Sequence, residues 1–194
     1  AKHDIGISVV FSYSTNHYIR IYATTKYGAK KADESIKNMG YILHCFNCFH
    51  REITKDSLLS SQKKCSECNS KLNTAGPLWL GKISNREFCE LMEKEVKQRK
   101  FKLEKRIGKI LASTKSEIEA PITYYVIDKL CDALGLPVPT TKKVVESLQK
   151  KGFQASLTHF NSKGIKTDAS AAKIKEFLQR TYIGSMANLV KIGC

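Results

Sequence analysis

Four cysteines form two closely spaced pairs in the first half of the sequence. Cys45 and Cys48 lie in HCFNCFH, and Cys65 and Cys68 follow in KCSECNSK, with sixteen residues between the pairs. This C-x2-C-x16-C-x2-C spacing is typical of a four-thiolate zinc site, because two tight turns can each supply two sulfur ligands to a tetrahedral ion. A thioredoxin-like couple needs one C-x-x-C that opens a helix, and neither pair opens one. Four thiolates leave no open coordination position, so the sequence predicts a structural zinc ion.

The alternative is that these are four ordinary buried cysteines. Polar neighbours such as Ser66 and Glu67 would make a poor apolar core around them, which favours the metal site. His44 and His50 flank the first pair and are spare candidate ligands, although the cysteines already complete the shell, and His50 is expected to be a solvated loop residue. Asn69 follows the last ligand, where glycine is common, and asparagine tolerates the left-handed backbone conformation better than most residues.

The charge of the chain is strongly unbalanced. Its 194 residues include 33 Lys and Arg against 18 Asp and Glu, giving a formal net charge of +15. Such a balance indicates a polyanionic partner, either nucleic acid or an anionic membrane surface. No stretch approaches the roughly 20 apolar residues of a membrane span. The three cysteines outside the pairs are Cys89, Cys131 and Cys194, and an odd count of 7 without a secretion signal favours a reducing, cytoplasmic setting.

The elements that would position the cysteines are mainly strands. β-branched and aromatic runs predict strands at residues 7–13, 18–25, 41–45 and 78–81. The first two read as a hairpin, and the N-terminal stretch reads as a strand that begins in mid-fold. A helix with Ala32, Ile36 and Met39 at helical spacing precedes the third strand and is predicted to stop at Gly40. Gly76-Pro77 predicts a turn.

The pattern changes to helical from Ser84 onward. Ser84 and Glu87 fit a capping box that opens a helix reaching about Lys100. A second helix follows over residues 101–113, and Pro121 ends the pair. The last third then predicts helices at 123–134 and 142–151, with Gly152 stopping the second, strands at 153–160 and 165–167, and a final helix capped by Asp168. The apolar stripes of the last two helices are expected at Val144, Val145 and Leu148 and at Ile174, Phe177 and Leu178.

Helix, turn, helix, strand, turn, strand is the element order of a winged helix. We therefore predict an α+β fold, in which a β-rich half that bears a zinc ribbon is followed by a helical, winged-helix-like half. The expected parts are a β-rich subdomain at 1–81, a helical connector at 82–120 and a winged-helix-like binding subdomain at 121–194.

Basic residues gather on this winged-helix-like part. The residues predicted to contact nucleic acid are Lys142, Lys143, Lys150, Lys151, His159, Lys163, Lys166 and Thr167. The second helix of such a module enters a groove, and the wing touches phosphates. The alternative is a solvated lysine face on a winged helix that contacts protein, and His159 could equally be a hydrogen-bonded core histidine. A further basic run over residues 97–109 is expected to be a solvated helix surface.

Enzyme signatures are missing from the sequence. It contains no G-x-G-x-x-G after a strand, no P-loop, no H-E-x-x-H and no G-x-S-x-G. No catalytic residue can be assigned, and the residues alone describe a binding module.

Four sequence blocks carry a more specific signal. HYIRIY (17–22), GPLWLGKI (76–83), YYVIDKL (124–130) and SLTHFNSKGIKTDA (156–169) together resemble the C-terminal region of the tRNA (guanine-26) N2-dimethyltransferases. The order and spacing of the blocks match along nearly the whole chain, and the THxxxxGIKTDA block is the most distinctive. The cysteine quartet occurs in many, but not all, members of that family.

The resemblance implies that this chain is the tRNA-binding part of a longer enzyme. Full-length members carry an S-adenosylmethionine-binding methyltransferase domain ahead of this region, and its cofactor loop and D-P-[FY]-G motif have no counterpart here. The family transfers two methyl groups to the exocyclic N2 of guanosine 26 in tRNA, a reaction that no residue of this segment can be assigned. The implied partners are tRNA and the methyltransferase domain of the same parent chain, in a monomeric, archaeal-like, cytoplasmic protein.

Two hypotheses of different classes stand at this point. The first is the substrate-binding part of a tRNA methyltransferase, with structural zinc here and S-adenosylmethionine on the parent enzyme only. The second is a free-standing factor with a zinc ribbon and a winged helix, acting in transcription or on the ribosome.

Overall fold

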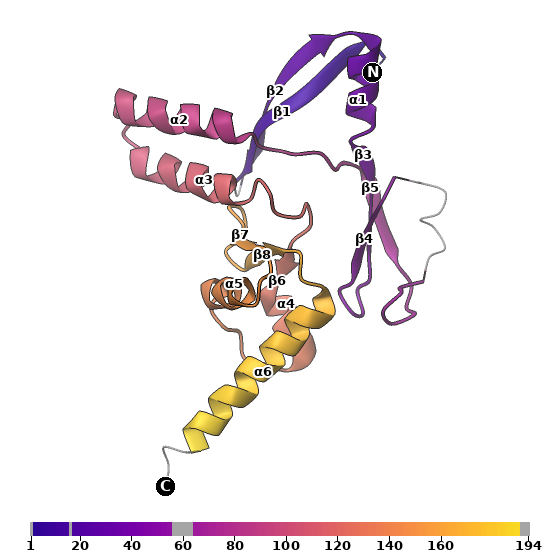
Figure 1. Cartoon of the computed structure of the whole chain (residues 1–194), viewed down its shortest axis with the longest axis vertical. Helices are drawn as coiled ribbons and strands as arrows, with labels where there is room; N and C mark the ends of the chain where they lie inside the picture. Colours follow the sequence, from indigo (N-terminus) through magenta and orange to yellow (C-terminus); the bar gives the residue numbers. More distant parts are fainter. Residues whose placement is uncertain (1, 16, 56–63, 191–194) are drawn as a thin grey trace.

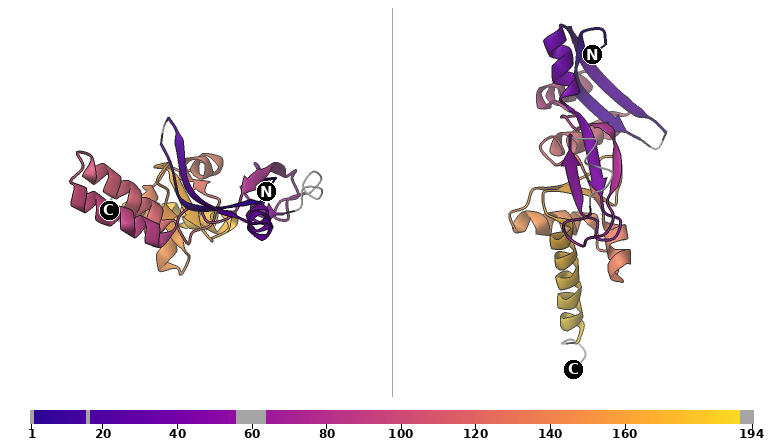
Figure 2. Two further views of the ribbon diagram at one scale, coloured as in Figure 1. Left: turned by 90° about the horizontal axis from the view of Figure 1, so that it is seen from above. Right: turned by 90° about the vertical axis from the view of Figure 1, so that its right-hand side faces the viewer.

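The computed structural model describes residues 2–15, 17–55 and 64–190, with side chains described as far as residue 181. Figure 1 shows an elongated molecule with a two-stranded ribbon at one end and the last helix at the other. A three-stranded sheet lies on one side of the molecule, and a pair of helices lies on the other. The last helix projects away from the remaining elements (Figure 2). No helix in the described part of the chain has both the length and the apolar character needed to cross a membrane.

An antiparallel ribbon confirms the predicted hairpin and extends it at both ends. It consists of β1 (Ile5–Ser14) and β2 (Ile19–Tyr27). Helix α1 (Ala29–Ile36) packs against β1, and its Ser35 hydroxyl accepts a hydrogen bond from the Ile7 N–H at 2.7 Å. The helix thus covers the outer edge of β1, whereas every residue of β2 is exposed.

The second sheet places β3 (Met39–His44) between β4 (Arg51–Thr54) and β5 (Asn73–Trp79), with both pairings antiparallel. Strand β3 was expected, whereas the sequence analysis did not predict β4. The short loop between β3 and β4 holds the first cysteine pair, and the second pair lies ahead of β5. The sheet therefore brings the two pairs to the same end.

An expected helix stop at Gly40 and an expected turn at Gly76-Pro77 are wrong, because both positions lie inside this sheet. The α1 helix ends at Ile36, and Gly40 belongs to β3, where a Cβ atom would come within 2.8 Å of the Thr54 carbonyl oxygen. Gly76 and Pro77 lie within β5 instead of forming a turn. Because β5 is an edge strand, the missing N–H of proline removes no required ladder hydrogen bond.

The predicted helix pair is confirmed as α2 (Arg86–Arg99) and α3 (Glu104–Ser116). The cap differs from the expected Ser84, because the Asn85 side chain accepts from the Phe88 N–H at 2.9 Å while the Ser84 hydroxyl donates to the preceding carbonyl. The helices pack on the ribbon through a small core: Phe11, Cys89, Val96 and Leu111.

The last third combines three helices with a small sheet. Its elements are β6 (Tyr125–Val126), α4 (Ile127–Leu134), α5 (Thr141–Lys150), β7 (Ala155–Leu157), β8 (Gly164–Thr167) and α6 (Ala171–Val190). The strand order is β6-β8-β7, and both pairings are antiparallel. The helix that was expected over 123–134 is wrong in its first turn, because Tyr125 pairs with Ile165 in the sheet.

One boundary of the last two helices differs from expectation and one agrees with it. Helix α6 begins at Ala171, and Ser170 caps it by accepting a hydrogen bond from the Lys173 N–H at 3.3 Å, so Asp168 is not the cap. Gly152 ends α5 as expected, with a positive φ of 86°.

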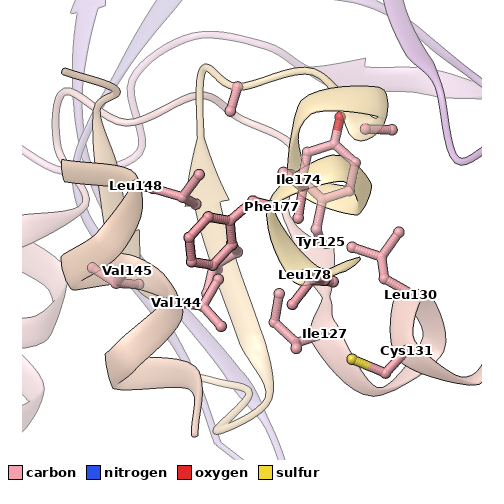
Figure 3. Packing of buried hydrophobic residues seen from close by; sticks show 13 residues of the cluster. Tyr125, Ile127, Leu130, Cys131, Val144, Val145, Leu148, Ile174, Phe177 and Leu178 are labelled. Carbon is pink, nitrogen blue, oxygen red and sulfur yellow. The ribbon is translucent and has the colours of Figure 1, made fainter. Parts of the chain in front are cut away.

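These elements share the largest hydrophobic core of the molecule. Figure 3 shows side chains of α5 facing those of α6, with Tyr125, Ile127 and Leu130 closing the cluster. The predicted apolar stripes are confirmed at the buried positions Val144, Val145, Leu148, Ile174, Phe177 and Leu178. Cys131 is a buried free thiol in the same core, and Cys194 lies outside the described residues.

Substitution of Ile174 by Ala is expected to lower the free energy of unfolding by about 2–5 kcal/mol. The side chain is 0% exposed, so its removal leaves a cavity between α6 and the rest of the core. Urea denaturation followed by circular dichroism measures the change. The matched control is Gln179→Ala on the exposed face of α6, expected within about 0.5 kcal/mol of wild type. Equal stabilities for the two variants would contradict the assigned core.

The observed architecture is a mixed α+β fold. Its N-terminal part is rich in strands and bears the four-cysteine cluster, and helices dominate the part that follows.

Candidate metal centre and basic surface

The two cysteine pairs sit in two turns with the same backbone hydrogen-bond pattern. In the first turn the Phe49 N–H donates to the Cys45 carbonyl and the Cys45 N–H donates to the His50 carbonyl, both at 2.9 Å. In the second turn the Asn69 N–H donates to the Cys65 carbonyl at 2.9 Å, and the Cys65 N–H donates to the Ser70 carbonyl at 2.8 Å. Repeated backbone geometry of this kind aims both cysteines of each pair toward one point.

Both turns require a residue in the left-handed backbone region. Phe49 has a φ of 67° and Asn69 a φ of 58°. Asn69 therefore adopts the conformation that its position predicted. A phenylalanine in this conformation is uncommon, and its ring contacts the adjacent C-terminal core.

The four sulfur atoms form a compact cluster. All four Sγ atoms lie within 4.8 Å of one another, and the Cys45–Cys68 and Cys48–Cys65 pairs are each 3.4 Å apart. Ligands of a tetrahedral zinc ion with Zn–S bonds of about 2.3 Å lie about 3.8 Å apart. The donor set and its spacing therefore fit zinc.

Polar neighbours support the thiolate form of one ligand. The Asn47 Nδ2 donates to the Ser70 hydroxyl at 3.1 Å and lies 3.6 Å from the Cys68 sulfur. Hydrogen bonds from Ser70 lower the pKa of the Cys68 thiol to about 5. Burial, in contrast, raises the pKa of Cys48 to about 12, so a metal ion would have to displace a proton there.

The spare histidines have other partners. The His50 Nε2 lies 3.0 Å from Glu52 Oε1, so this side chain is half-buried and paired instead of solvated as expected. The His44 Nδ1 accepts from the Arg51 Nε at 3.4 Å, and burial followed by the charge of Arg51 lowers the pKa of His44. Neither histidine belongs to the cluster of candidate ligands in the described residues.

A buried ionic cluster joins three parts of the fold. Glu117, just after α3, accepts hydrogen bonds on Oε1 from the His159 backbone N–H at 2.6 Å and from its ring Nδ1 at 2.9 Å. The other oxygen, Oε2, pairs with the Lys166 Nζ at 3.1 Å, without hydrogen-bond geometry. The His159 Nε2 accepts from the Ser14 N–H at 3.1 Å at the end of β1. The hydrogen-bond roles therefore define a neutral imidazole with its proton on Nδ1.

This cluster corrects the expected wing surface. The side chains of Glu117, His159 and Lys166 are only 4–5% exposed, and Thr167 is also buried. Lys166 pairs inward because a buried carboxylate lies within reach, and the Thr167 hydroxyl accepts from the Ala169 N–H at 3.1 Å. His159 is a hydrogen-bonded core histidine, which was the alternative to its predicted contact with nucleic acid.

Five of the eight predicted contact residues do lie on the surface. Lys142, Lys143, Lys150 and Lys151 on or next to α5 are exposed, as is Lys163 between β7 and β8. Lys163 lies 3.5 Å from Asp128. The second basic run over 97–109 is also exposed, as expected.

The sequence analysis missed Glu117 as the centre of the cluster. Its partner His159 is 42 residues away, so no local pattern links the two. Glu117 lies between Ser116 and Ile118 just after the helix, and nothing in this local sequence indicates a buried carboxylate.

A model of a known protein family matches most of the chain. The model of the family described as N2,N2-dimethylguanosine tRNA methyltransferase matches residues 1–179. The chain belongs to this family.

Curated relatives in the family have closely similar sequences over this region. The tRNA (guanine(26)-N(2))-dimethyltransferase of Methanobrevibacter smithii is 43% identical over 179 residues, which is 92% of this chain and 46% of the relative. The tRNA (guanine(26)-N(2)/guanine(27)-N(2))-dimethyltransferase of Aquifex aeolicus is 32% identical over 180 residues, or 92% and 44% of the two chains. The chain thus spans about half the length of the curated relatives it matches.

A solved structure of the family has the same fold. The structure described as Trm1 from Pyrococcus horikoshii with S-adenosyl-L-methionine aligns with a TM-score of 0.77 and 27% identity, covering 91% of this chain and 44% of that one. The THxxxxGIKTDA block, which carried most of the resemblance, contains the buried His159, Lys166 and Thr167. Its Gly164 leaves room for the Thr158 hydroxyl, which would lie 2.7 Å from a Cβ atom there. In this chain the block therefore joins parts of the fold.

Proposed function

We propose that this chain is the tRNA-binding part of a tRNA (guanine-26) N2-dimethyltransferase. The observation that carries the proposal is the match of 92% of the chain to a relative of that name at 43% identity, which spans 46% of that relative. In the parent enzyme, two methyl groups would pass from S-adenosylmethionine to the exocyclic N2 of guanosine 26. The cofactor and the catalytic residues would belong to the other half, and this part would hold the tRNA.

The proposed cofactor of this part is one structural zinc ion. Cys45, Cys48, Cys65 and Cys68 would hold it, since their Sγ atoms converge within 4.8 Å. The ion would fix the ends of β3, β4 and β5 relative to one another and would take no part in methyl transfer.

The proposed subdivision keeps the boundaries expected from the sequence: 1–81, 82–120 and 121–194. The last part would act as a winged helix, because α4, α5, β7 and β8 follow one another in the order of that motif. In this role α5 would face the RNA, and the connection between β7 and β8 would serve as the wing.

The charged face of α5 supports a phosphate-binding role. Lys142 and Lys143 lie at the start of the helix and Lys150 and Lys151 at its end, all exposed. Lysine presents a mobile point charge, which suits phosphates better than base edges. The deep, narrow major groove of A-form RNA also keeps side chains from reading bases. The contacts would therefore position tRNA without selecting its sequence.

The triple substitution Lys142→Ala, Lys143→Ala and Lys150→Ala tests the proposal. We expect weaker tRNA binding and a slope of log affinity against log salt that is shallower by roughly one unit per lysine. Fluorescence anisotropy with a labelled tRNA transcript at several salt concentrations measures both quantities.

The matched control carries Lys97→Ala, Lys102→Ala and Lys109→Ala, which remove the same charge from the exposed surface of α2, α3 and their connection. A larger loss of affinity and slope in this control than in the α5 variant would place the RNA surface on α2 and α3. A wild-type chain that fails to bind tRNA would contradict the proposed function itself.

A further inference from the structure

A groove lies between the first cysteine turn and the segment that leads into α4. It has a volume of about 320 Å³ and is formed by β3, β4, the turn between them and residues 122–129. The side chains that matter for its chemistry are His44, Phe46, Phe49, Arg51, Tyr124 and Lys129. None of them belongs to the α5 surface proposed above.

An aromatic ring is held exposed at this groove. Phe46 lies between Cys45 and Cys48 and is 70% exposed. The backbone hydrogen bonds of the turn hold the main chain on either side of Phe46, and its ring meets the His44 ring in an edge contact with centroids 4.6 Å apart. At least one face of the Phe46 ring is therefore uncovered and open to a flat partner.

The groove also carries positive charge without compensation. Arg51 lies over the Tyr125 ring at 4.4 Å and the Tyr124 ring at 6.0 Å, so its guanidinium is held in place by aromatic contacts. Among the described residues, no carboxylate lines the groove. In the same part of the chain, neither Arg51 nor Lys129 forms an ion pair.

The carboxylates next to Arg51 and Lys129 in sequence have other partners. Glu52, beside Arg51 on β4, points to His50 at 3.0 Å, and Asp128, beside Lys129 on α4, pairs with Lys163 at 3.5 Å. An apolar protein surface docked here would leave two cations buried without partners, which is costly. A ligand with a flat aromatic face and an adjacent anion would cover the Phe46 ring and also pair with Arg51 and Lys129.

We propose that this groove binds an unpaired nucleobase of the tRNA together with its flanking phosphate. Phe46 stacks on the base, as aromatic side chains do in single-stranded RNA recognition, and Arg51 and Lys129 contact the phosphate. The inference rests on the proposed function and adds to it a second contact that needs an unstacked nucleotide. The lysines of α5 need only the phosphate backbone.

The test is tRNA binding by the full 194-residue chain carrying Phe46→Ala, with zinc content measured to show that the cysteine turns are intact. Loss of base stacking is expected to weaken binding roughly 10- to 100-fold. The salt slope should not change, because no charge is removed. Phe46→Trp should keep wild-type affinity and Phe46→Leu should not. Phe101→Ala, at a 45% exposed ring outside the groove, is the matched control and should change affinity less than twofold.

Three outcomes would overturn the proposal. Unchanged affinity in Phe46→Ala with full zinc content would show that the ring does not touch RNA. Wild-type affinity in Phe46→Leu would show an apolar contact without stacking, as expected for a protein partner. In both cases tRNA binding by the wild-type chain would survive, so the proposed function would stand. If the wild-type chain bound neither tRNA nor a single-stranded oligonucleotide, both proposals would fail together.

Discussion

Cys45→Ser is expected to unfold the sheet formed by β3, β4 and β5 while the C-terminal part keeps its structure. Structural zinc sites contribute about 10–16 kcal/mol of apparent binding free energy, which is comparable to the stability of a whole domain. The core around this sheet has few buried residues, namely Leu43, Cys45, Cys65 and Leu72, and two of them are proposed metal ligands. Without the metal, little apolar burial is left to hold the strands together.

Amide hydrogen exchange, read by mass spectrometry, shows which part of the chain unfolds and which part stays folded. Residues 39–55 and 64–79 should lose protection in the variant or after chelation, whereas 125–181 should keep it because that part has a large core of its own. Elemental analysis should find one zinc per wild-type chain and none in the variant. Cys131→Ser is the control, since Cys131 is a buried cysteine outside the cluster. A Cys45→Ser protein with bound zinc and a protected sheet would refute the metal site.

Glu117→Gln is expected to lower the free energy of unfolding by about 3–5 kcal/mol, the usual cost of leaving a buried charge without its partner. The side chain of Lys166 is only 5% exposed, so solvent screens its charge poorly once the carboxylate is lost. The amide of the variant can still accept from the His159 N–H, and the effect should therefore come mainly from the unpaired ammonium group. Denaturant unfolding measures the change.

The double variant Glu117→Gln with Lys166→Met separates charge from packing. Removal of both charges should recover most of the lost stability, because a buried ion pair is often no more stable than an apolar replacement of similar volume. A double variant as unstable as the single one would show that packing around Glu117, and not the ion pair, causes the loss. Lys163→Met, at an exposed lysine in the connection between β7 and β8, should have little effect.

Sequence reasoning succeeded where the structure depends on local patterns. The spacing of Cys45, Cys48, Cys65 and Cys68 sufficed to predict their convergence, because each pair occupies a turn whose geometry is set by a few residues. The stop at Gly152 was equally local, since it needs only a residue that accepts a positive φ.

The errors fall where distant segments decide the outcome. Tyr125 and Val126 continue the helical pattern of α4, but pairing with β8 makes them a strand. Lys166 was expected on the surface, and the choice between surface and core stayed open for His159, because their partner, Glu117, is remote in sequence and turned inward by the end of α3. Charge composition predicts that a chain is basic, whereas only the tertiary fold decides which of its basic side chains meet solvent.

The open edge of β2 has a consequence for the chain in solution. Within the described residues β2 pairs only with β1, and its Ile19 and Ile21 are 71% and 61% exposed. An unpaired edge with apolar side chains is a template for strand addition by a second molecule, so this ribbon is the place where self-association of the protein would begin. Arg20 and Lys26 lie in the same strand. Together with the net charge of +15, these two charges oppose the approach of a second chain. Screening of the charge by high salt, or its neutralisation by polyanions, would therefore favour aggregation.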